Sequence, residues 1–306
     1  MNQYSSESTH LKSPMKLRWP PKCEIGGSLG FIFNLVIFVV ACRIKTLSES
    51  FAILVSTMAA ADGVVCGLFL LYACPMIILN ITILKQYSYH CGFALALAYD
   101  ISITTHVVIV VNRFLAVFTP ITYKRVFGIQ TTKLIVFVTV SVTVAIIFVF
   151  FQIFGCQLYY DQEFWMFFYS DQKICVWYAT NLGDRKMFAS AVLTMALNLM
   201  IIAKVHTARK KLNHGQVSVA NKKREMNFLK QTIGQGTYLF VFSIIFLYVS
   251  SLTSNKILGF IIGSDIWCSL HTLDGLFVLI YNSEIREVVI GPKDGLSKRA
   301  SRVTLT

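Results

Sequence analysis

Charged residues are scarce in this chain of 306 residues. Asp, Glu, Lys and Arg together make up 14% of it, whereas hydrophobic residues make up 55%. Water-soluble domains carry roughly 25% charged residues, so the composition argues against a soluble class. The chain also lacks the HExxH, GxSxG, glycine-rich phosphate-loop and CxxC patterns that mark many catalytic or metal-binding sites. We therefore predict that it is not an enzyme and needs no organic cofactor.

The apolar residues gather into seven long runs. The length of each run is close to the ~20 residues needed to cross a hydrocarbon core about 30 Å thick. Only helices and closed barrels satisfy every backbone polar group in lipid, and the ~10-residue alternating strands of a barrel are not seen. We predict an all-α, seven-transmembrane helix bundle with spans at Ile25–Cys42, Phe51–Leu79, Cys91–Phe118, Leu134–Gly155, Met187–Ala203, Ile233–Thr253 and Ile257–Tyr281.

These spans divide the chain into a tail at residues 1–24, the bundle at residues 25–282 and a second tail at residues 283–306. In the second tail, Ile285, Val288 and Val289 have the spacing of one face of a short interfacial helix. The segment from Lys204 to Lys230 carries eight basic residues, and we expect it to extend the fifth and sixth helices. Tethered beneath a membrane, it lies near anionic lipid and is a poor nucleic-acid site.

The distribution of Lys and Arg predicts the orientation of the bundle. The loops after the first, third and fifth spans, with the second tail, carry 18 of these residues, against 9 on the other face. Basic residues are enriched in cytoplasmic loops, so we predict the N-terminus outside and the C-terminus in the cytoplasm. The N-glycosylation triplet that begins at Asn80 falls in a loop that this orientation places outside, although such triplets also arise by chance.

Four of the eight cysteines, Cys23, Cys91, Cys156 and Cys175, fall on the predicted outer face, where disulfides persist. Cys91 opens the third span, whereas Cys156 and Cys175 flank the loop between the fourth and fifth spans. We expect a bridge from the third span to fold this loop over the mouth of the bundle. Cys91–Cys175 is the preferred pair. Cys156 competes as the partner of Cys91 or pairs with Cys23, and the sequence alone leaves the connectivity open.

Ionisable residues inside the predicted spans are expensive to bury in lipid, so each is a candidate functional residue. Arg113 lies 22 residues after Cys91, about 33 Å along a helix, which places it at the cytoplasmic end of the third span. There it either snorkels to the headgroups or switches between partners on neighbouring helices. The complete set is Asp62, Asp100, His106, Arg113, Asp265, His271 and Asp274.

The outer halves of the third, fifth, sixth and seventh spans, covered by the loop at residues 156–184, form the expected ligand pocket. Asp100 lies nine residues after Cys91, about 13.5 Å along the helix, which suits the pocket floor. The aromatic and apolar lining predicts a small, largely apolar ligand, although each aromatic also suits ordinary helix packing. The predicted lining residues are Tyr99, Asp100, Trp177, Tyr178, Asp265, Trp267 and His271.

Several segments together resemble the rhodopsin-type receptor superfamily: FNLVIF, LVSTMAAAD, NRFLAVFTPITY and DGLFVLIYNSEIR. In detail the chain resembles the nematode serpentine chemoreceptors of class X (Srx), on SFAIL, VNRFLAVFTPITYKRVF, NKKREMNFLKQTIGQG and HTLDGLFVLIYNSEIR. The order and spacing of these segments cover most of the chain. The resemblance implies a G-protein-coupled chemosensory receptor in the plasma membrane of sensory neuron cilia, which detects a small molecule and activates a heterotrimeric G protein.

The resemblance also implies roles at the cytoplasmic end. Arg113 would be the arginine that opens the G-protein crevice, and Pro120 and Tyr123 would shape the following loop against the G protein. Asn112 stands where the superfamily usually has an acidic residue, so the resting state would lack that local ion pair.

A polar cluster in the middle of the bundle is implied as well. Asn34, Asp62, Ser102 and Asp274 match the cluster that binds a sodium ion or a proton in the superfamily. If Asp62 and Asp274 face each other, the two carboxylates must share a proton or bind sodium, and we expect this site to stabilise the resting state. The alternative is two separately hydrogen-bonded carboxyls. Beside this cluster the chain has Gly275 where the superfamily has proline.

Two other functional classes stay open. Intramembrane Asp and His residues can line an ion path, so a ligand-gated channel or transporter is the main alternative. Transporters usually show paired repeats and broken helices, which the sequence lacks. The altered switch residues are also compatible with an orphan receptor that no longer signals.

Overall fold

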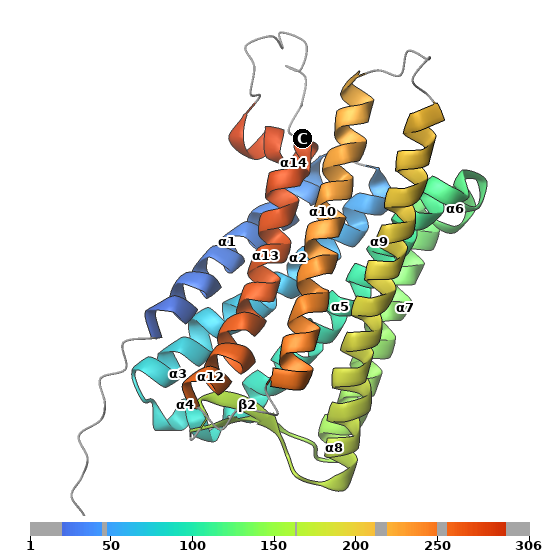
Figure 1. The fold of residues 1–306 in the computed structure, drawn as a ribbon. Helices are drawn as coiled ribbons and strands as arrows, with labels where there is room; N and C mark the ends of the chain where they lie inside the picture. Colours follow the sequence, from blue (N-terminus) through green and yellow to red (C-terminus); the bar gives the residue numbers. More distant parts are fainter. Residues whose placement is uncertain (1–19, 45–47, 163, 212–218, 250–255, 292–306) are drawn as a thin grey trace, which may run out of the picture.

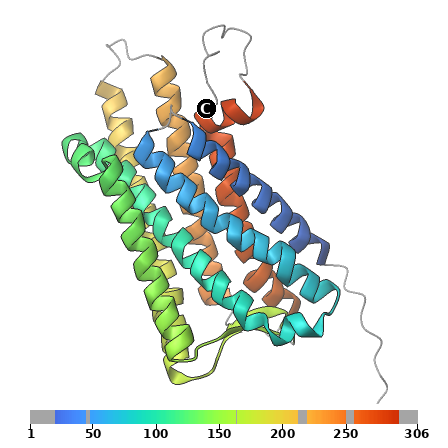
Figure 2. The same cartoon turned by 180° about the vertical axis from the view of Figure 1, so that it is seen from behind.

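Long helices pack side by side into a bundle, seen from two sides in Figure 1 and Figure 2. This computed structural model describes residues 20–44, 48–162, 164–211, 219–249 and 256–291. Most of the predicted first tail and the end of the second therefore lie outside the described residues. Helix α2 packs against α1 and α5, α9 packs against α5 and α10, and α13 packs against α1 and α10.

Every predicted apolar run is helical over its described part, except at Leu79, Phe154 and Gly155, where the second and fourth predicted runs extend past the helix ends. The first four runs lie in α1 (Pro20–Arg43), in α2 with η1 and α3 (Glu49–Leu68, Phe69–Ala73, Cys74–Ile78), in α5 (Ser88–Phe118), and in α7 with η2 (Ile129–Phe148, Val149–Ile153). The last three lie in α9 (Lys186–Lys211), which continues α8 and η3 (Lys173–Tyr178, Ala179–Arg185), in α10 with η4 (Val219–Ile244, Ile245–Val249), and in α12, η5 and α13 (Lys256–Phe260, Ile261–Asp265, Ile266–Tyr281).

The helix ends differ from the predicted spans in ways that have local causes. Helix α1 begins at Pro20 rather than Ile25, because a proline has no N–H to leave unpaired in a first helical turn. Helices α9 and α10 run on to Lys211 and begin at Val219, so the predicted extension of the fifth and sixth helices is confirmed. The segments η1 to η5 are π-helical turns, each of which inserts an extra residue into its helix.

Six of the long helices are apolar and long enough to cross a membrane. The helix from Lys256 to Tyr281 is continuous, but it contains Asp265, His271 and Asp274 and is not among these six. The described chain is thus a helical membrane bundle, while the count of seven crossings and the orientation of the termini stay predictions.

Apolar side chains cover the outside of the bundle, as expected for a protein that faces lipid. On α7, Phe137 is 68% exposed and Leu134 is 59% exposed, and on α1 Ile32 is 53% exposed. Water-soluble proteins rarely expose apolar residues in continuous patches of this kind. The faces of α1 and α7 are therefore read as lipid-facing surfaces.

A two-stranded antiparallel hairpin closes one end of the bundle. Strands β1 (Leu158–Asp161) and β2 (Met166–Tyr169) pair with Leu158 opposite Tyr169, and they lie at the end away from α14 (Figure 1). Tyr160 donates its backbone N–H to Ser88 Oγ on α5, at 3.0 Å. A Cβ on Gly92 would lie only 1.8 Å from the carbonyl oxygen of Leu158, so glycine is required for this close approach. The loop therefore folds over the bundle mouth, as predicted.

The disulfide that accompanies this hairpin is not the predicted one. Cys156 is bonded to Cys175, and Cys91 is a free, buried thiol with 3% of its surface exposed. The predicted Cys91–Cys175 bridge and its alternative, Cys91–Cys156, are both wrong. The bridge joins the two ends of the loop, whereas the Ser88 hydrogen bond and the Gly92 contact attach the loop to α5. The side chain of Cys23 lies outside the described part of the chain.

The opposite end of the bundle carries two short helices, α6 (Pro120–Val126) and α14 (Ser283–Ile290) (Figure 1). Asn282 begins α14 as its N-cap, because its side-chain oxygen accepts from the backbone N–H groups of Glu284 and Ile285. The predicted short helix in the tail is therefore present. Ile285 is fully buried against Ile37 and Val278, which holds α14 against the bundle.

Candidate ligand pocket and polar core

A cavity of about 480 Å3 lies beneath the hairpin. Helices α5, α9, α10 and α13 with their π-helical turns form its walls, and residues 158–169 form its cover. Volumes of about 300–1,000 Å3 are typical of small-molecule sites. This is the region where the sequence predicted a pocket.

Aromatic rings dominate the inner wall of this cavity. Tyr99 of α5 and Trp267 of α13 line it, and their rings meet edge to face with centroids 5.6 Å apart. Trp267 also packs edge to face on Phe69, with centroids again 5.6 Å apart. Both residues belong to the predicted set, and edge-to-face packing fixes their orientation.

The other five predicted lining residues lie elsewhere. Asp100 forms an ion pair with Lys186, with Oδ1 and Nζ 2.6 Å apart. Trp177 is 51% exposed on the outside of the bundle and stacks on Phe150. Tyr178 is buried, with its ring centroid 4.6 Å from that of the same Phe150.

The predicted pocket residues of the last helix also separate. Asp265 ends η5 and does not line the cavity. His271 lies one turn below Trp267 and is fully buried at Asp62. Asp265 lies within the π-helical turn η5 and His271 follows it, so counting at a regular helical repeat misplaces their side chains.

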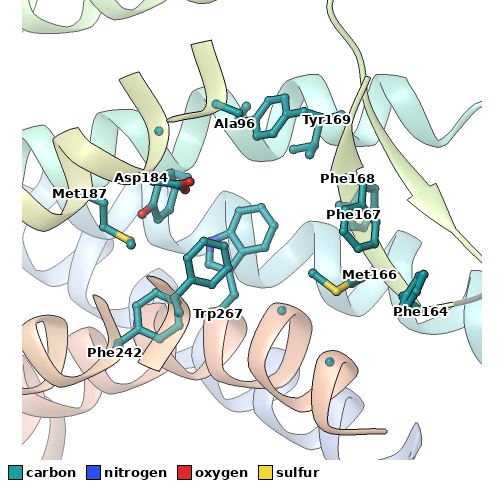
Figure 3. Close-up of a pocket in the computed structure, with 17 residues that line it drawn as sticks. Ala96, Phe164, Met166, Phe167, Phe168, Tyr169, Asp184, Met187, Phe242 and Trp267 are labelled. Carbon is teal, nitrogen blue, oxygen red and sulfur yellow. The ribbon is translucent and has the colours of Figure 1, made fainter. Parts of the chain in front are cut away.

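The hairpin and the fifth and sixth helices supply lining residues that the sequence reasoning missed. The hairpin contributes Leu158, Phe164, Met166, Phe167, Phe168 and Tyr169. Asp184, Met187 and Phe242 enter from the helices (Figure 3). The dense aromatic run at residues 164–169 was a signal for the cover, because such residues seldom crowd into a solvated loop.

A buried polar cluster lies deeper in the bundle. Ser102 Oγ donates to Asp62 Oδ1 at 2.5 Å, and His271 Nδ1 lies 2.7 Å from the same oxygen. Asn34 donates its side-chain N–H to the carbonyl oxygens of His271 and Gly30, at 3.1 and 2.9 Å. The structure thus brings together three of the four predicted core residues, and it adds His271.

The fourth predicted residue, Asp274, is buried one turn beyond His271 on α13. Its backbone carbonyl accepts from Gln235 Nε2 at 3.4 Å. No described hydrogen bond joins the Asp62 and Asp274 carboxyls. A Cβ on the adjacent Gly275 would lie 2.9 Å from Asn34 Oδ1, so the glycine that replaces the usual proline makes room for Asn34.

Ser102 and His271 both engage one oxygen of the Asp62 carboxyl, Oδ1, and no described group forms a hydrogen bond to the other. Hard cations require several oxygen ligands, but Asp62 Oδ1 already takes two hydrogen bonds and Asn34 points its nitrogen toward His271. Within the described ranges, no group of three or more His, Cys, Asp or Glu side chains is arranged to hold a metal ion. A histidine next to a buried carboxylate supplies its own counter-charge when it is protonated.

The predicted switch residues lie at the end of the bundle that carries α14. Asn112 is buried, and the Arg113 guanidinium lies over the Phe51 ring, 4.7 Å from the centroid. Pro120 occupies the first turn of α6, and Tyr123 on the same helix lies 3.4 Å, oxygen to oxygen, from Ser50 of α2. A cation–π contact with Phe51 therefore links Arg113 of α5 to α2.

Asn80 lies in the exposed turn between α3 and α4 (Thr82–Gln86), with a positive φ of 54° that asparagine tolerates well. Its side-chain oxygen accepts a hydrogen bond from Lys85 Nζ. The turn is at the same end of the bundle as the hairpin (Figure 1).

A multi-pass helical bundle with a covered pocket at one end is typical of membrane receptors, and comparison with known proteins gives the family. Residues 25–282 match the family described as "Serpentine type 7TM GPCR chemoreceptor Srx". This match covers most of the chain, so the chain belongs to that family, as its motifs predicted. It is a receptor family and not an enzyme family.

A curated relative agrees with this assignment. The chain is 27% identical over 286 residues to "Serpentine receptor class X 45" of Caenorhabditis elegans. The similarity covers 86% of this chain and 78% of that relative.

Proposed function

We propose that this protein is a chemosensory receptor that binds a small, largely apolar molecule beneath the hairpin and activates a heterotrimeric G protein at the Arg113 end. The observation that carries the proposal is the aromatic cavity of about 480 Å3, closed by the hairpin and separated from Arg113 by the buried polar core. A ligand that moves Trp267 also presses on His271, because both contact the Tyr99 ring.

The proposed orientation has the N-terminus and the hairpin outside and the C-terminus, α6 and α14 in the cytoplasm. The receptor then lies in the plasma membrane of sensory neuron cilia, with its basic cytoplasmic segments near anionic lipid. Epitope tags at the two ends of the chain, stained on intact and permeabilised cells, test this directly. Tags on the same side would rule out the receptor topology. They would also rule out the membrane depth assigned to each buried residue.

Asn80 is the proposed glycosylation site, since it lies in an exposed turn at the hairpin end. Treatment of the expressed protein with an endoglycosidase should shift its mobility on a gel. The shift should disappear in Asn80→Gln. A shift that persists in this variant would place the glycan elsewhere.

Expression in a G-protein reporter cell, against a panel of volatile and pheromone-like molecules, tests the function. Arg113→Ala should abolish the response at normal surface expression. A channel would keep a ligand-gated current in this variant, and a non-signalling orphan receptor would bind without any response. Both outcomes count against the proposal.

The cavity itself can be blocked without disturbing the packing around it. A Cβ on Gly183 would meet nothing within 4 Å, and Gly183 lines the cavity, so Gly183→Leu should fill part of it. We expect roughly tenfold or greater loss of ligand potency from the resulting clash. Gly26→Leu is the matched control, because Gly26 is also unhindered but lies on α1 away from the cavity.

We further propose that the polar core holds a proton rather than sodium and stabilises the resting state. The hydrogen bond between His271 and Asp62 is its basis. Asp62→Asn should raise basal signalling in the reporter cell, whereas replacing sodium with choline in the medium should change neither form. Unchanged basal signalling in the variant would remove the switch role from this site.

A further inference from the structure

Of the described residues that line the cavity beneath the hairpin, one is acidic and none is basic. Its lining residues are aromatic or apolar apart from glycines and Asp184, which is the last but one residue of η3. No lysine, arginine or histidine in the described part of the chain lines it. A charge among apolar side chains is screened less than a charge in bulk water, so it interacts more strongly with a ligand.

The nearest basic residues are committed to other partners. Lys186 is paired with Asp100, with Nζ and Oδ1 2.6 Å apart. Arg185 is exposed and donates to Asn181 Oδ1 at 2.7 Å. Among the described residues, no ion pair or hydrogen bond involves the Asp184 carboxylate. Lys186 balances Asp100, and Arg185 is exposed outside the cavity lining, so Asp184 is the charged residue among the described residues that line the cavity.

The cavity has two chemically different ends. Figure 3 shows Asp184 and Met187 at one end and Phe164 and Met166 at the other, with Trp267 between them. The faces of Tyr99, Trp267 and Phe242 are attractive to a cation, since an aromatic ring carries partial negative charge on its face. The described lining residues at the Phe164 end are apolar.

We propose that the ligand is a small amine with an apolar body, whose ammonium group pairs with Asp184 and whose body extends toward the hairpin. This rests on the proposed function, because it assigns the chemical class of the molecule that the pocket binds. An alkylammonium stays protonated near neutral pH, as a lysine does, and donates charge-assisted hydrogen bonds to the carboxylate. A carboxylic acid of the same size is repelled, and an alcohol gains only a neutral hydrogen bond.

Three probes of nearly the same shape separate these cases: 2-phenylethylamine, 2-phenylethanol and 3-phenylpropanoate. Binding of each to the purified full-length protein in lipid nanodiscs is measured by the shift of its unfolding temperature with probe concentration. We expect the amine to bind roughly tenfold or more tightly than the alcohol, and the acid to bind more weakly than either.

Variants then assign the preference to one side chain. Asp184→Asn should lower amine affinity about tenfold or more and leave alcohol affinity within about threefold, while Asp184→Glu should keep part of the preference. Asp171→Asn removes an exposed acid just beyond β2, outside the cavity lining, and is the matched control for the change in net charge. It should change neither affinity.

The proposal is overturned if the amine and the alcohol bind equally, if no amine binding is measurable, or if Asp184→Asn leaves their ratio unchanged. The comparison in the unmodified protein holds even if a variant fails to fold. A receptor that responds to neutral molecules in the reporter cell but not to amines would refute the amine assignment alone. If the unmodified receptor gave no response to any molecule that depends on Arg113, the proposed function would be refuted instead.

Discussion

The contact between Gly92 and the hairpin gives a sharp prediction about how the pocket is covered. A methyl group at residue 92 would lie 1.8 Å from the Leu158 carbonyl oxygen and 2.9 Å from its Cβ. The first neighbour is backbone, so it cannot rotate away as a side-chain end does. We expect Gly92→Ala to displace β1 from α5, at a cost of roughly 1–3 kcal/mol for the overpacking. The higher helix propensity of alanine offsets up to about 1 kcal/mol of this.

The thiol next to this glycine reports the displacement. Cys91 is free and 3% exposed in a cluster that includes Leu158 and Tyr160 of the hairpin, so a thiol reagent reaches it only when this packing opens. Each 1.4 kcal/mol lost from hairpin docking raises the open population about tenfold. Gly92→Ala should therefore raise the alkylation rate of Cys91 by about that factor, as followed by mass spectrometry on the purified protein.

The controls for this measurement come from the same chain. Cys42 is free and exposed, so it reacts in every variant and should be replaced by serine in the background. Gly26→Ala adds a methyl group that meets nothing within 4 Å, and it should leave the rate unchanged. If Gly92→Ala left both the Cys91 rate and the unfolding temperature unchanged, the close packing of hairpin on helix would be refuted.

The remaining predictions concern the disulfide and the polar core. Cys156→Ser opens a bridge between residues 19 apart and should cost about 3 kcal/mol of stability, whereas Cys91→Ser should cost less than half as much. Equal losses in non-reducing thermal unfolding would contradict the Cys156–Cys175 pairing. His271→Ala leaves Asp62 buried without its partner and should cost roughly 3–5 kcal/mol if the pair is charged. Asp62→Asn keeps an acceptor oxygen and should cost less, so the opposite order of unfolding temperatures would contradict the pair.

Much of the helical framework was predictable from the length of the apolar runs. A helix in lipid satisfies its own backbone hydrogen bonds, so the presence of each helix depends on local sequence alone. The start of the first helix was predicted less well, because Pro20 lies outside the apolar run. The family followed from ordered motifs, and its match over residues 25–282 confirmed it.

The candidate site was predicted only in part. Tyr99 and Trp267 line the cavity as predicted, but His271 turned out to belong to the polar core. The direction of a side chain depends on the π-helical turns and on how each helix is rotated against its neighbours, and neither is encoded in a regular repeat. Asp184 was missed because it lies in η3, at the edge of the predicted fifth span.

The sequence by itself determined that the chain forms apolar helices and which family it belongs to. The family resemblance implied a cluster of Asn34, Asp62, Ser102 and Asp274, of which the structure brings the first three together. Only the tertiary structure decided which cysteines pair, which residues cover the pocket and which partner Asp62 has. The reason is physical: helix formation is a local property of the chain. A disulfide, a lid contact or a buried ion pair instead depends on the distance between segments that are far apart in sequence.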